Sequence, residues 1–144
     1  MVKDLVHDPI FLGLKSEEAR KEDFSVAQDL LDTLTAHKET CVGMAANMIG
    51  VRKRIIAVDD EGKYLLMLNP EIMKAEGAYN TEEGCLSLLG GPRPCKRYSS
   101  IKVRWLTTDF QIRIKTFKNR KVIYKARCIG ITGNLYTKTA YCFW

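Results

Sequence analysis

The chain has 144 residues, a formal net charge of +6, 46% hydrophobic residues and 28% charged residues. This length suits one compact domain, and the composition excludes wholesale disorder. The longest apolar stretches, such as residues 64–68, are far shorter than the ~20 residues that span a bilayer. The N-terminus shows no export signal, so we expect a cytoplasmic protein without membrane contact.

The first predicted element is a helix that begins near Asp23. Asp23 is expected to cap the free amides at its start, and acidic residues cluster just before it. We expect His37, near the end of the helix, to be an exposed terminal residue rather than a ligand. One apolar stripe follows the helical period at Ala27, Leu30, Leu31 and Leu34.

Short β-like runs follow the helix. Residues 54–58 and 64–68 are rich in β-formers, with a turn at 59–62 between them. Asn69-Pro70 is expected to end the second strand, because proline has no N–H to donate. Further strands are predicted at 101–106, 111–117 and 120–125, with turns at 107–109 and 118–119. A helix followed by mostly antiparallel short strands predicts an α+β fold.

Basic residues concentrate in the second half of the chain. Between Lys96 and Arg127 there are eleven Lys or Arg residues and one acid, Asp109. At 101–105 and 112–115, cations alternate with apolar residues. This alternation favours a solvated face of strands over a nucleic-acid surface.

The five cysteines indicate neither a disulfide framework nor a zinc knuckle. Their number is odd and no C-x-x-C pair occurs among them. They are Cys41, Cys85, Cys95, Cys128 and Cys142.

Three segments, in order and at matching separations, resemble one family. Residues 43–50, GMAANMIG, are similar to the G-x-G-L-A-A-x-Q-I-G motif of peptide deformylases. Residues 83–87 match the E-G-C-L-S motif of that family completely, and Asn69-Pro70 resembles the strand-ending segment between the two motifs. The resemblance covers roughly residues 24 to 129, and we assign residues 1–129 to a deformylase-like domain.

The resemblance implies a metal-dependent hydrolase that removes the formyl group from formyl-methionyl peptides, with the ribosome nearby. In the family, one cysteine and the two histidines of H-E-x-x-H hold a divalent metal, often iron(II), and also zinc or nickel; the glutamate acts as base. Cys85 would be the thiolate ligand, and the N–H of Leu86 would donate to the developing oxyanion. Gly43 and Gly50 would shape the adjacent turn.

Glu83 and Arg97 are candidates for an ion pair that supports this site. The alternative for the same two residues is an ordinary surface ion pair.

Position 48 is a first departure from the family. The family has a glutamine there whose amide helps hold the oxyanion, whereas this chain has Met48, and a thioether cannot donate a hydrogen bond. Losing one such donor typically costs on the order of 10²–10³ in rate.

The third motif is a second and larger departure. Residues 126–129, ARCI, resemble the lead-in to A-R-x-x-Q-H-E-x-D-H, but residues 130–135 are GITGNL. No histidine, glutamate or aspartate follows Asp109, and the only histidines are His7 and His37. Residues 130–144 are therefore expected to form a divergent tail in which the metal-binding C-terminal helix is missing.

Two explanations of this break stay open. A shifted reading frame after codon 129 predicts a remnant of H-E-x-x-H in another frame of the coding DNA. The other explanation is a diverged paralogue.

Three candidate functions stay open. They are an enzyme lineage whose present chain is inactive, a non-catalytic peptide-binding protein, and a basic RNA-associated or ribosome-associated module.

Overall fold

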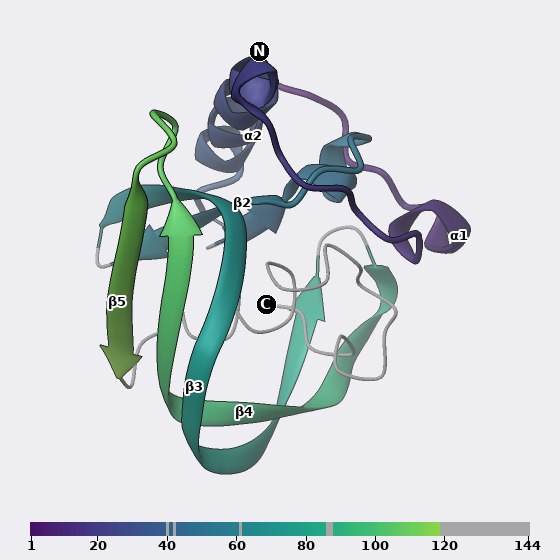
Figure 1. Cartoon of the computed structure of the whole chain (residues 1–144). Coiled ribbons are helices and arrows are strands. Elements are labelled where there is room, and N and C mark those ends of the chain that lie inside the picture. The colour runs from purple at the N-terminus through teal and green to yellow at the C-terminus, as the bar shows by residue number, and fades with distance from the viewer. Residues whose placement is uncertain (40, 42, 61, 86–87, 119–144) are drawn as a thin grey trace.

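The computed structural model describes residues 1–39, 41, 43–60, 62–85 and 88–118; of residue 9 and residues 80–97 it gives the backbone alone. In this part of the chain a helix packs on a curled antiparallel sheet with the strand order β1-β2-β3-β4-β5 (Figure 1). The predicted α+β class is confirmed. The elements are α1 (Pro9–Leu12), η1 (Lys21–Asp23), α2 (Phe24–Ala36), β1 (Gly43–Ala45), η2 (Ala46–Ile49), β2 (Ile55–Asp60), β3 (Lys63–Cys85), β4 (Leu88–Leu106) and β5 (Ile112–Lys118).

The main helix, α2, packs its apolar stripe on β1 and β2. Ala27, Leu30 and Leu34 are fully buried, as the periodicity predicts, whereas Leu31 is half-buried. Burial of each leucine stabilises the fold by roughly 1.5–3 kcal/mol. The stripe therefore fixes the helix against the sheet.

Two expectations at the ends of α2 were wrong. Asp23 precedes the helix, but its carboxylate makes no capping bond to α2 and instead accepts from the Arg20 N–H at 2.7 Å. The acid therefore closes the preceding η1 turn. His37 is half-buried rather than exposed, and its Nδ1 lies 2.9 Å from the Thr33 carbonyl oxygen.

The turn between β2 and β3 agrees with the prediction. The Gly62 N–H donates to Asp59 Oδ1 at 2.8 Å, and Gly62 has φ +89°, which favours glycine.

Strand β3 does not end at Asn69-Pro70 as predicted. Asn69 takes φ +51°, and the pairing with β4 shifts register between Leu68 and Glu71. The Asn69 side chain accepts from the Ala19 N–H at 2.7 Å and donates to the Ala19 carbonyl at 3.0 Å. This irregularity accommodates the proline, so the ladder resumes beyond it.

The β3–β4 pair is a long curled hairpin that forms most of the sheet (Figure 1). Its ladder runs from Leu68 opposite Leu106 to Cys85 opposite Leu88, so β4 is much longer than the predicted strand at 101–106. The turn predicted at 107–109 is present, with the Phe110 N–H donating to the Thr107 carbonyl at 2.8 Å.

Alternation on the basic strands is confirmed for β4 and wrong for β5. On β4, Ile101 and Val103 are buried while Lys102 is exposed. On β5, Ile112 and Ile114 are 53% and 51% exposed, so both faces of that segment meet solvent. The core reaches β5 through one fully buried residue of that strand, Phe117.

The predicted strand at 120–125, the turn residue Asn119 and the tail 130–144 lie outside the described residues, as does residue 129 at the proposed domain boundary. Among the helices that the structure describes, none has the length and apolar character needed to cross a membrane.

Candidate active site

The first motif segment, residues 43–50, forms β1, η2 and the turn that follows. Gly43 pairs with Val58 in the β1–β2 ladder, so this glycine lies in a strand and not in the turn that the resemblance implies. Gly50 does form the turn, with φ +88° and its N–H donating to the Asn47 carbonyl at 3.2 Å. Residues 43–49 are all buried, which makes the segment a packed part of the core.

Met48 lies at the centre of this segment and is fully buried. Its thioether sulfur lies 3.5 Å from the Ala45 backbone nitrogen, which can donate to it. Its carbonyl accepts the Val6 N–H at 2.8 Å, which ties the N-terminal segment to η2. The sulfur accepts and does not donate, so this side chain has no means of holding an oxyanion.

The second motif lies at the end of β3. Cys85 is the last residue of that strand and pairs with Leu88 on β4. The side chain of Cys85 and the whole of Leu86 lie outside the described residues, so their proposed roles stay predictions.

The predicted pairing of Glu83 with Arg97 also stays a prediction. The ladder places Arg93 opposite Glu83 and places Arg97 opposite Tyr79.

Near the first motif lie the half-buried Tyr64 and the buried Cys41. Burial raises the pKa of the Tyr64 phenol, and the neighbouring Asp59, Cys41 and Glu39 raise that pKa further. The Cys41 thiol donates to the Gly43 carbonyl at 2.9 Å. This buried, hydrogen-bonded cysteine acts as a packing residue.

The residues that the structure describes offer no ligand set like that of the family, and the side chain of Cys85 and residues 130–135 lie outside them. No group of three His, Cys, Asp or Glu residues gathers within those residues. His37 ends α2, whereas His7 precedes α1, so the two imidazoles do not form an i, i+4 pair on one helix. We therefore derive no step through a metal.

The sequence interpretation missed the role of the N-terminal segment. Leu12 and Ala19 are buried in the core, and Ser16 is 3% exposed. Glu17 pairs with Lys53 in an isolated parallel β-bridge. This bridge joins the N-terminal segment to the loop that follows the first motif. The apolar residues among the first fourteen were the sequence feature that could have predicted packing of this segment on the core.

Solved structures share this fold. A class I type b peptide deformylase from Acinetobacter baumannii, solved with Met-Ala-Ser bound, aligns with a TM-score of 0.80 at 22% identity, over 96% of this chain and 98% of that chain. The peptide deformylase of Thermotoga maritima aligns with a TM-score of 0.77 at 19% identity, over 93% of each chain. These likenesses define the class: the α+β fold of peptide deformylases.

Sequence comparison gives the family. The profile described as polypeptide deformylase matches residues 6–130. The peptide deformylase of Clostridium beijerinckii is 50% identical over 117 residues, which are 81% of this chain and 85% of that protein. That of Clostridium botulinum is 32% identical over 120 residues, 79% of this chain and 80% of that protein. The chain belongs to the peptide deformylase family, and the match extends the resemblance to the N-terminal segment.

Proposed function

We propose that this chain keeps the peptide deformylase framework but does not itself catalyse deformylation. One observation carries the proposal: positions 130–135, in register with Q-H-E-x-D-H, read GITGNL. The family profile stops at residue 130, which supports placing the break there.

The physical reason is the chemistry of the nucleophile. Formamide hydrolysis near neutral pH needs a metal that lowers the pKa of a bound water and a base that accepts its proton. Cys85 alone supplies one thiolate, which leaves the metal without its imidazole ligands and the water without a base. Met48 removes a further donor from the oxyanion.

The proposed ligand class follows from the relatives. The Acinetobacter baumannii protein was solved with Met-Ala-Ser, and the sequence relatives are bacterial peptide deformylases. We assign formyl-methionyl peptides as the ligand class, in a bacterial cytoplasm close to the ribosome. The likeness to a structure solved with Met-Ala-Ser bound supports peptide binding without turnover as the second candidate function.

Formate release tests the proposal. The purified protein is loaded anaerobically with iron(II), nickel or cobalt and given a formyl-methionyl peptide, with an active relative as the positive control. We expect no formate above the buffer rate. Turnover that disappears in Cys85→Ser would refute the proposal.

A binding measurement separates the two candidates. Calorimetric titration with a formylated peptide should show saturable binding if the chain binds peptides without turnover. If neither heat nor turnover is found, the peptide-binding candidate is wrong.

A further inference from the structure

A cleft lined by cations lies between the N-terminal segment and the loop before β2, and neither the 43–50 motif nor the 83–87 motif contributes to its lining. Its volume is about 690 Å³. Five cations and two carboxylates line it, which gives a formal local charge of +3. The lining side chains come from residues 15–18, Arg20 and residues 52–54.

This gathering of cations is local and runs against the charge of its surroundings. Residues 1–60 hold eleven Asp or Glu and eight Lys or Arg, so that part of the chain is net acidic. Five of those eight cations nevertheless line this one cleft.

Backbone bonds hold the two walls of the cleft together. The Glu17 N–H donates to the Arg52 carbonyl at 3.0 Å, and the Arg54 N–H donates to the Glu17 carbonyl at 2.8 Å. The guanidinium of Arg52 donates to the Lys15 carbonyl at 2.9 Å, which ties its side chain across the cleft. The cations are thus presented on a preorganised frame.

Carboxylates cancel part of this charge, at Lys53. Glu17 lies 3.4 Å from Lys53, which also lies 3.8 Å from Asp23, so these groups largely neutralise one another. Lys15, Arg20 and Arg52 are exposed and face the cleft with only Glu18 as a further lining acid. Guanidinium groups match phosphate oxygens in a two-pronged geometry.

A second cleft of about 430 Å³ adjoins the first and shares Glu18 and Arg20 with it. The half-buried Phe110 lines the second cleft together with Trp105, which is almost fully buried. Arg104 also lines it, and its guanidinium lies 3.5 Å from the carboxylate of Glu71, another lining residue. An accessible aromatic ring beside cationic side chains is an arrangement that binds a base and the neighbouring phosphates of single-stranded nucleic acid.

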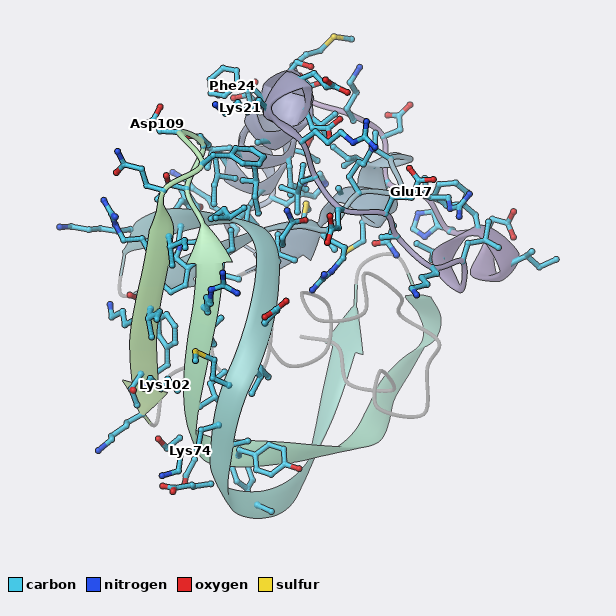
Figure 2. The ribbon with its side chains drawn as sticks, in the orientation of Figure 1. Glu17, Lys21, Phe24, Lys74, Lys102 and Asp109 are labelled. Atoms are coloured by element: carbon cyan, nitrogen blue, oxygen red, sulfur yellow. The ribbon has the colours of Figure 1, made fainter. Side chains whose placement is uncertain are left out.

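We propose that the cleft between residues 15–20 and 52–54 binds the phosphates of single-stranded RNA, with a neighbouring base against Phe110. Apart from Arg104, which lines the adjoining second cleft, the site does not use the basic stretch of β4 and β5, and it does not depend on the proposed loss of catalysis. Figure 2 shows the separation: Glu17 lies beside the N-terminal segment, whereas Lys74 and Lys102 lie at the far end of the sheet.

Fluorescence anisotropy with a labelled RNA of roughly 10 nucleotides tests the site. For the double variant Lys15→Ala/Arg20→Ala we expect binding at least about tenfold weaker and a salt dependence shallower by about 1.4 in log–log slope, since each phosphate contact on a single strand contributes about 0.7. The matched control Lys63→Ala/Lys102→Ala removes two exposed cations elsewhere and should bind like the unmodified chain. Glu18→Gln should bind more tightly, because it removes the opposing charge.

Several outcomes would overturn the proposal. They are no binding by the unmodified chain, an equal loss in the control, or no loss in the Lys15→Ala/Arg20→Ala variant. Competition identifies the ligand: if inorganic phosphate or a mononucleotide displaces the RNA at equal phosphate concentration, the cleft is a small-anion site and the RNA assignment is wrong. Thermal melts of all variants should coincide, since the mutated side chains are exposed.

Discussion

Met48 has a side chain that suits the core and that cannot donate a hydrogen bond. Its side chain is fully buried and its sulfur faces the Ala45 nitrogen, while its carbonyl receives the Val6 N–H. A thioether is an adaptable filler of such a position. The residue type therefore suits packing of η2 and not stabilisation of an oxyanion.

Substitutions at Met48 should show how much the packing of this side chain contributes to the free energy of unfolding. We expect Met48→Ala to lower the free energy of unfolding by about 2–5 kcal/mol, through lost burial and a cavity. Met48→Gln should cost about 1–3 kcal/mol because the amide enters a buried site, whereas Met48→Leu should cost less than about 1.5 kcal/mol. Urea unfolding measures all three. A Met48→Gln variant as stable as the parent would show that the position reaches solvent.

At the scale of elements, the long β3–β4 hairpin depends on local irregularities that let it curl. Gly77, on β3, has φ +72°, a conformation that L side chains rarely adopt. A Cβ at this position would lie 1.9 Å from Ser99 Oγ and 3.0 Å from Ser99 Cβ. Ser99 Oγ in turn donates to the Glu76 carbonyl at 3.3 Å. The hairpin therefore requires glycine here for both backbone and space.

Gly77→Ala should lower the free energy of unfolding by about 2 kcal/mol, from backbone strain and displacement of Ser99. Gly62→Ala is the matched control: Gly62 has φ +89°, but a Cβ there would meet no atom within 4 Å, so only the strain of about 1 kcal/mol applies. Adding Ser99→Ala to Gly77→Ala should recover part of the loss. Equal costs for Gly77→Ala and Gly62→Ala in denaturant unfolding would rule out the steric contribution.

At the scale of the whole molecule, an ion pair joins strands that are not neighbours in the sheet. Lys115 Nζ on β5 lies 2.9 Å from Asp60 Oδ2 at the end of β2, and the Asp60 side chain is only 8% exposed. The same ammonium lies 5.2 Å from the centre of the Phe117 ring. The curl of the sheet therefore closes on a contact between residues 55 positions apart.

Lys115→Ala should lower the free energy of unfolding by about 1–2 kcal/mol, because a nearly buried carboxylate loses its cation. The partial exposure of Lys115 keeps the value below that of a fully buried pair. Lys102→Ala, which removes an exposed cation from β4, should change stability by less than about 0.5 kcal/mol. Thermal or urea unfolding measures both, and equal effects would mean that the Asp60 contact contributes nothing.

Because Lys115 contributes to stability through this contact, it is a poor residue for testing whether the basic face of β4 and β5 binds RNA. A loss of RNA binding on neutralising Lys115 would mix an electrostatic effect with a structural one. Lys102, which the structure leaves exposed, is the better probe of the basic face of β4.

The sequence by itself determined the features that depend on local pattern. The stripe of Ala27, Leu30 and Leu34 predicts α2, because periodicity alone fixes which face a helix buries. The motifs at residues 43–50 and 83–87 indicate the family, and residues 130–135 show where the chain departs from the third motif, because residue types are visible without coordinates.

Tertiary structure decided what depends on partners distant in the chain. Strand β3 continues past Pro70 because Asn69 bonds both backbone groups of Ala19, fifty residues away, and no local rule contains that partner. The cationic cleft arises only when residues 15–20 meet residues 52–54 through backbone bonds. Side chains separated in sequence combine their fields only after folding brings them together, and for that reason the cleft was invisible in a linear reading of charge.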